Sequence, residues 1–121
     1  IEAYKVLFAD SYDFANRKDL YDAYGQMIAA DPDNRKLRFN RAILMEKMGL
    51  LAQARETYAE LEAEGGLSAA QLNNRGVARL KANRFPAAVA DFKASITQDP
   101  ALAEPYFNLA AVFAYWACRA M

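Results

Sequence analysis

The stretch Ala69–Leu102 reads AAQLNNRGVARLKANRFPAAVADFKASITQDPAL and decides how the rest of the chain is interpreted. Apolar or small residues recur in steps of three and four in both halves, which marks one face of a helix in each. The pattern breaks at 83–84 and ends at Asp99–Pro100. The stretch therefore predicts two helices, 69–82 and 85–98, joined by a tight turn. Such a hairpin cannot bury its apolar face alone, so we expect neighbouring copies of it.

Copies of the hairpin recur at a constant spacing along the chain. Asparagine stands at 40, 74 and 108, in equal steps of 34, and Pro32 and Pro100 are separated by two such steps. A repeated hairpin of this length indicates an array in which each copy packs on its neighbours. Small and aromatic residues keep the same register, in the pairs Ala54 and Ala88, Tyr24 and Tyr58, Tyr58 and Phe92, Ala42 and Gly76, and Gly76 and Ala110.

This period of helix, turn and helix resembles the tetratricopeptide repeat. The resemblance covers the whole chain. The residues that carry the family's pattern are, copy by copy, Tyr4, Leu7, Tyr24 and Pro32; Ala54 and Tyr58; Gly76, Ala88, Phe92 and Pro100; and Tyr106, Leu109, Ala110 and Phe113. The chain departs from the pattern at Phe8, Leu20, Arg41, Gly65–Gly66, Arg75 and Arg79.

The resemblance implies an all-α fold, an α–α superhelix in which about seven helices form a right-handed solenoid. A single array is expected over 1–121, with repeats at about 1–34, 35–68 and 69–102 and a half repeat at 103–121. Local signals place helices at about 3–15, 19–30, 36–48, 51–64, 69–82, 85–98 and 103–119, with the turn of the first hairpin at Asn16–Lys18. Asn34 is expected to cap one helix, Ser68 with Gln71 to form a capping box, and Gly65–Gly66 to end another in the left-handed conformation.

Composition limits the possible functions. The 121 residues include 15 basic and 15 acidic ones, and a nucleic-acid partner would favour a basic excess. Histidine, the commonest general base and metal ligand, is missing from the sequence, as is a glycine-rich phosphate loop. We therefore expect no enzyme activity, no catalytic residue, no cofactor and no metal site. Cys118 is the single cysteine, which allows no internal disulfide.

The longest apolar run, 109–118, is too short for a membrane span, which needs about 20 residues. The compartment stays open between the cytoplasm and a bacterial periplasm.

In the tetratricopeptide family the first helix of each repeat lines a concave groove that binds a peptide or a partner protein. Carried over position by position, the resemblance assigns partner-binding candidates in all four copies. These candidates are Lys36, Phe39, Asn40, Ile43, Lys47, Asn73, Asn74, Val77, Lys81, Phe107, Asn108 and Tyr115, with Lys5, Ala9, Tyr12 and Ala111 beside them.

The asparagines at 40, 74 and 108 are the most informative candidates, because they share one repeat position. An amide side chain offers a donor and an acceptor and can therefore bond a peptide backbone of any sequence. The alternative is that these amides are solvated or bond locally. A carboxylate clamp like that of chaperone adaptors is disfavoured: Lys5 and Asn40 match it, but Ala9, Ala70 and Asn74 do not, and paired carboxylates need several converging cations.

Two other functions remain open. The apolar helix at 103–119 lacks a second helix to pair with. It either caps the array or suggests a self-assembling module, a homo-oligomer formed through this helix. The chain begins without Met, and we expect it to belong to a longer protein in which it can serve as an accessory domain.

Overall fold

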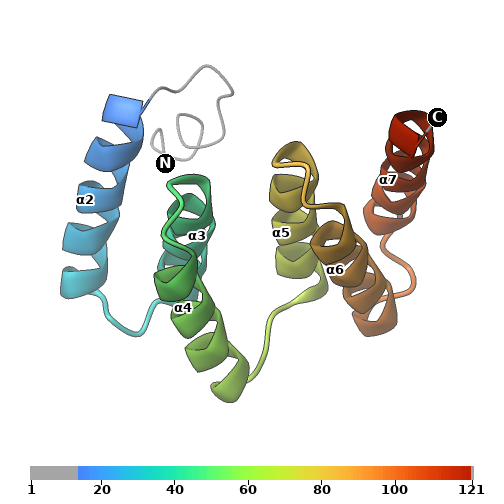
Figure 1. Cartoon of the computed structure of the whole chain (residues 1–121). Coiled ribbons are helices and arrows are strands. Elements are labelled where there is room, and N and C mark those ends of the chain that lie inside the picture. The colour runs from blue at the N-terminus through green and yellow to red at the C-terminus, as the bar shows by residue number, and fades with distance from the viewer. Residues whose placement is uncertain (1–13, 121) are drawn as a thin grey trace. The chain divides into compact units, whose positions relative to one another are not determined.

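The computed structural model of the chain describes residues 14–120, and side chains from 16 to 118. Within this range the chain is all-α, as expected, and has no strand (Figure 1). The helix expected at 3–15 lies almost wholly outside the described residues, so six helices are described where about seven were expected. They are α2 (Phe14–Ala30), α3 (Arg35–Lys47), α4 (Leu51–Ala63), α5 (Ala69–Lys81), α6 (Phe85–Gln98) and α7 (Glu104–Ala120).

The predicted turn at Asn16–Lys18 is wrong, because α2 begins at Phe14 and runs through these residues. The segment contains neither glycine nor proline, and arginine and lysine are good helix formers. Lys18 also forms an ion pair of 3.2 Å with Asp22 one turn later, which supports the helix locally. This run of polar residues therefore continues the helix and does not break it.

The other helix ends follow the signals in the sequence. The side chain of Asn34 accepts a hydrogen bond from the backbone N–H of Leu37 at 3.2 Å. Ser68 and Gln71 form a reciprocal capping box at the start of α5. Gly65–Gly66 follow α4 with φ angles of 135° and 86°, the left-handed region that glycine enters without a steric penalty. All three capping predictions are confirmed.

The chain divides into two compact units, residues 1–64 and 65–121. In the first unit α3 packs against both α2 and α4. Tyr24 of α2 and Leu44 of α3 form one core cluster, and both are 2% exposed. The rings of Phe39 and Tyr58 join α3 to α4 with centroids 6.0 Å apart.

In the second unit α5 and α6 form a hairpin, and α7 packs against both of them. The core consists of Phe85, Ala88 and Phe92 from α6 and Val112 from α7. Gly76 of α5 lies against Phe92, and this close approach positions the two helices of the hairpin.

Residues that stand 34 positions apart in the sequence are buried to a similar extent in the structure. Tyr24, Tyr58 and Phe92 are 2%, 6% and 0% exposed, and Ala54 and Ala88 are 1% and 0% exposed. The register weakens in α7, where Ala110 is exposed. Hairpins α3–α4 and α5–α6 thus use equivalent positions to join their two helices. No helix among the described residues is long and apolar enough to cross a membrane.

Candidate functional site

The partner-binding candidates in the described residues fall into three groups by exposure. Phe39, Asn40, Ile43 and Asn73 are buried and take part in packing within their own units. Lys47, Val77 and Asn108 are half-buried. The candidates that face solvent are Lys36 on α3, Asn74 and Lys81 on α5, and Phe107 and Tyr115 on α7. Phe107 stands out because 80% of it is exposed. Lys5, Ala9 and Tyr12 lie outside the described residues.

The three repeat-related asparagines have three different environments. Asn108 of α7 donates from Nδ2 to Oδ1 of Asn73 of α5 at 2.9 Å, so its amide bonds locally. Asn74 is exposed. Asn40 is buried, and within the described part of the chain its Nδ2 has no hydrogen-bond partner. The local bonding that was left open as the alternative therefore occurs at Asn108, while Asn74 is available to an external ligand.

A buried charge cluster in the second unit went unnoticed at the level of sequence. The carboxylate of Asp91, 4% exposed, accepts two hydrogen bonds from Arg75, from Nη2 at 2.7 Å and from Nε at 3.0 Å. It also accepts one from Nη1 of Arg79 at 2.9 Å. A carboxylate between two guanidinium groups bonds α5 firmly to α6. The signal in the sequence was that Arg75 and Arg79 replace apolar residues of the repeat.

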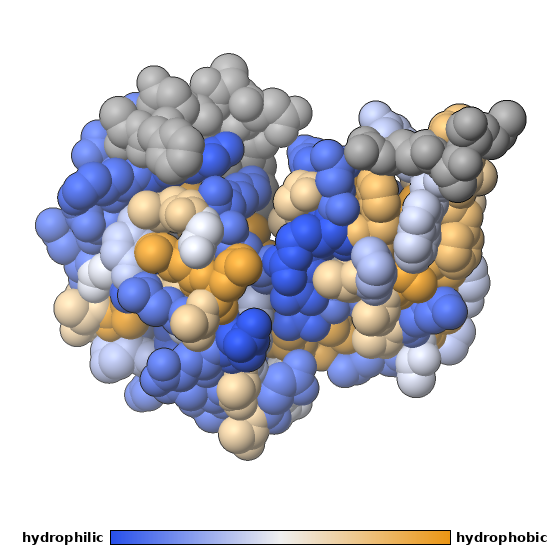
Figure 2. All heavy atoms as spheres, in the orientation of Figure 1, coloured by the Kyte–Doolittle hydropathy of each residue, from blue (hydrophilic) through white to orange (hydrophobic). Residues whose placement is uncertain are grey.

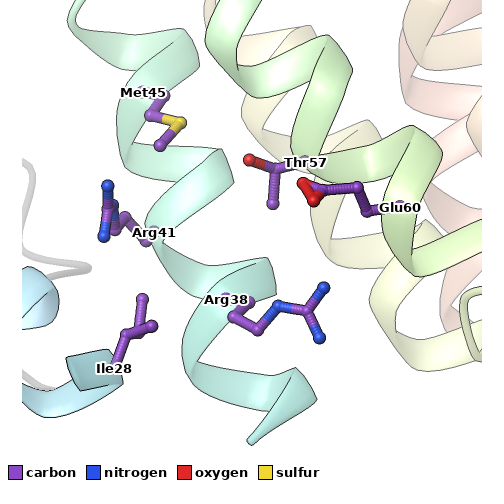
Figure 3. A pocket seen from close by; sticks show the side chains of 6 residues that line it. All are labelled: Ile28, Arg38, Arg41, Met45, Thr57 and Glu60. Carbon is purple, nitrogen blue, oxygen red and sulfur yellow. The ribbon is translucent and has the colours of Figure 1, made fainter. Parts of the chain in front are cut away.

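The first unit has a cavity of about 160 Å³ at its surface. Figure 3 shows Arg38, Arg41 and Met45 on α3, with Thr57 and Glu60 extending towards them from α4 and Ile28 at the end of α2. The guanidinium group of Arg41 lies on the α2 side, where Nη2 donates to the Tyr21 hydroxyl at 3.3 Å. Nε of Arg41 is buried and has no hydrogen-bond partner among the described residues, which ordinarily costs about 1–3 kcal/mol.

A second charged group holds α3 to the end of α4. Arg38 donates from Nη1 and Nη2 to the two carboxylate oxygens of Glu64 at 2.8 and 2.7 Å. Arg35 lies 3.5 Å from the same carboxylate. The hydrogen bonds from Arg38 lower the pKa of Glu64 below its ordinary value. Arg38 is therefore already engaged at the edge of the cavity.

The Glu64 pair predicts a pH-dependent contribution to stability. Because the folded pKa of Glu64 is lowered, its contribution is present above the ordinary pKa of 4.5 and disappears as pH falls through the folded pKa. Glu64→Gln should therefore lower the thermal midpoint slightly at neutral pH and leave it unchanged well below that pKa. Thermal unfolding of both proteins, at neutral pH and at a pH well below that pKa, measures this difference, which added salt should reduce at neutral pH. An equal difference at both pH values would contradict the assignment.

The surface of α7 is rich in exposed aromatic side chains. Figure 2 shows hydrophobic residues gathered over this part of the second unit. Trp116 and Tyr115 contact the buried ring of Phe85, with centroids 5.9 and 6.3 Å away, yet both remain exposed. An apolar patch of this kind commonly marks an interaction site. Its large residues are Tyr106, Phe107, Phe113, Tyr115 and Trp116, between 41% and 80% exposed.

Among the described residues, acidic, cysteine and histidine side chains form no group of three that could hold a metal ion. Cys118 is exposed near the end of α7. Comparison with protein-family models gives no match for the chain, and comparison with curated proteins gives none either.

Proposed function

We propose that the chain is a tetratricopeptide-like array that binds a peptide or a partner protein. The hairpins would stack as a right-handed superhelix, and the first helix of each would line its concave groove. The observation that carries the proposal is that residues one repeat apart are similarly buried. In each hairpin these equivalent residues pack between its two helices. The packing of α7 against both α5 and α6 also fits the first helix of a following repeat.

The exposed candidates suit recognition of an extended polypeptide. Asn74 offers a hydrogen-bond donor and an acceptor to a peptide backbone. Phe107 provides a large apolar contact, and a side chain of this kind commonly contributes much of the binding energy at an interface. Lys36 and Lys81 add positive charge to the same set of residues, which favours partners with acidic side chains.

A selection from displayed random peptides on the intact chain tests this function. The best peptide should bind Asn74→Ala,Phe107→Ala at least about tenfold more weakly, because the variant loses a hydrogen bond and an aromatic contact. Both residues are exposed, so the fold should persist, and circular dichroism checks this. Lys93→Ala is the matched control, since Lys93 is exposed on α6, the second helix of the same unit. Equal affinity for all three proteins would refute the proposed surface.

Self-assembly through α7 is the second candidate function, favoured by its exposed aromatic residues. A second copy of the chain would cover this patch and remove apolar area from water. Sedimentation measures the mass in solution: a dimer that Tyr115→Glu converts to a monomer supports self-assembly. A monomer that binds peptide supports the groove instead. Either activity is compatible with a role as an accessory domain of a longer protein.

A further inference from the structure

We propose that one face of α7 binds an amphipathic helix of another polypeptide, in the way that α6 covers α5. The face consists of Tyr106, Ala110 and Phe113, which are all exposed on α7. None of the three belongs to the peptide-binding candidates. The inference rests on the repeat of the proposed function, but not on its groove.

The equivalent positions of α5 face the second helix of their hairpin. Subtracting 34 from 106, 110 and 113 gives Leu72, Gly76 and Arg79. Gly76 lies against the ring of Phe92 of α6, and Leu72, about one turn earlier, is 6% exposed. Arg79 donates from Nη1 to the carboxylate of Asp91 of α6 at 2.9 Å. Helix α6 therefore contacts this face of α5 directly.

The first unit repeats this arrangement between α3 and α4. Subtracting 68 from the three positions of α7 gives Arg38, Ala42 and Met45. Arg38 donates to both carboxylate oxygens of Glu64 at the end of α4. Ala42 and Met45 are 0% and 5% exposed. Two hairpins of the same chain thus show these positions covered.

On α7 the same positions are open to solvent. Tyr106 and Phe113 are 46% and 47% exposed, and Ala110 between them is exposed as well. A small residue between two aromatic side chains admits a large side chain from a docking helix, as Gly76 admits the ring of Phe92. A helix on this face would remove apolar area from water, which drives most protein association.

The two hairpins indicate which helix fits this face. Each second helix has an alanine followed four residues later by an aromatic residue: Ala54 and Tyr58 in α4, and Ala88 and Phe92 in α6. Residues four apart lie on the same side of a helix, and all four are at most 6% exposed. We therefore expect the partner helix to present such a pair, with the aromatic ring over Ala110.

Charge distinguishes the partner helix from α6. Asp91 stands three residues after the alanine of α6, and its carboxylate accepts hydrogen bonds from Arg75 and Arg79. Adding 34 to the numbers of these arginines gives Leu109 and Phe113, so α7 has two apolar residues in place of the two cations. Burying a charge without a partner is strongly unfavourable. The partner helix should therefore have an apolar residue where α6 has Asp91.

A second copy of the chain fits the face less well than a separate helix. Its own α7 has Ala111 and Tyr115 exposed, four residues apart. In a head-to-tail contact, however, the same face of the second copy would remain open, and contacts of this kind continue from copy to copy. A separate helix closes the face in a complex of one to one.

Two synthetic peptides test the site by nuclear magnetic resonance on the isotope-labelled chain. One has the sequence of α6, residues 85–98, with Asp91→Leu, and the other has the unchanged sequence. The leucine peptide should shift the amide signals of Tyr106, Ala110 and Phe113 in a saturable manner. It should bind at least about tenfold more tightly than the aspartate peptide, whose carboxylate would lie unpaired against α7. Equal affinity of the two peptides, or shifts confined to α5, would overturn the proposal.

Phe113→Arg restores the cation that α5 has in Arg79 and should change the choice of peptide. The variant should lose the preference for the leucine peptide, because the aspartate regains a partner. Cys118→Arg is the matched control, since it adds the same charge to α7 at an exposed residue. Five positions further along, it lies on another side of the helix and should keep the preference. Circular dichroism checks that both variants fold, and the same preference in both would contradict the proposal.

Two further measurements separate this site from the other functions. Phe113→Arg should leave unchanged the affinity for a peptide selected to bind the groove. Groove binding that fails while the leucine peptide still binds refutes only the proposed function, and the reverse result refutes only the site on α7. Sedimentation without peptide should show a monomer. A dimer that Phe113→Arg converts to a monomer would assign the face to a second copy and overturn the proposal.

Discussion

Replacing Asp91 with alanine is expected to destabilise the second unit by about 3–5 kcal/mol, the usual effect of removing one partner from a buried ion pair. The carboxylate is 4% exposed, and three donors from Arg75 and Arg79 converge on it. Without it, two guanidinium groups that are only 13% and 16% exposed lose this carboxylate as a partner. Unfolding by urea, followed by circular dichroism, measures the loss.

The repeat supplies a matched control for this substitution. Thr57 stands one repeat before Asp91, and its hydroxyl donates only within its own helix, to the carbonyl of Gln53. Thr57→Ala should change the free energy of unfolding by no more than about 0.5 kcal/mol. Hydrogen exchange adds a regional measurement, since Asp91→Ala should reduce protection in α5 and α6 first. Similar losses for Thr57→Ala and Asp91→Ala would show that the charge cluster does not stabilise the second unit.

Gly76→Ala should destabilise the same unit by about 1–3 kcal/mol, as overpacking of a dense core commonly does. A Cβ atom at this position would lie 2.6 Å from Cε1 and 2.8 Å from Cδ1 of Phe92. Phe92 is 0% exposed and is packed among Phe85, Ala88 and Val112, so its ring has little room to move. The overlap should outweigh the roughly 1 kcal/mol by which alanine favours a helix over glycine.

Gly25→Ala separates the steric effect from helix propensity. Gly25 also lies inside a helix, α2, but among the described residues a Cβ there would meet only Nη1 of Arg41, at 3.8 Å, an ordinary contact. This variant should be as stable as the unchanged chain or more so. Thermal unfolding of the two variants gives the comparison. If Gly76→Ala proves at least as stable as Gly25→Ala, then α5 and α6 do not pack as closely at Phe92 as the structure shows.

Most helix ends could be predicted because their signals are local. Asn34, the Ser68 and Gln71 pair and Gly65–Gly66 each act within a few residues. The start of α2 differs from the prediction because Asn16–Lys18 are polar, and polarity alone does not end a helix. Lys18 and Asp22, one turn apart on the same helix, were the local signal against that interpretation.

The candidate site could be predicted less well, because exposure depends on how helices pack. The sequence does not show that Asn73 faces Asn108 on another helix, or that Asn40 is buried while Asn74 is exposed. The pairing of Arg75 with Asp91 likewise joins two different helices. It was visible only as an arginine at a position where the repeat is usually apolar.

Mapping a bound peptide on the chain tests the proposed function most directly. A peptide selected on the intact chain would be titrated into the isotope-labelled protein, and the amide signals of all helices followed. The account predicts shifts at exposed residues of the first helices of the hairpins: Lys36 on α3, Asn74 and Lys81 on α5, and Phe107 on α7. Signals of Glu56 on α4 and Lys93 on α6 should stay in place. Shifts confined to α4 and α6, with none on α3, α5 or α7, would contradict it.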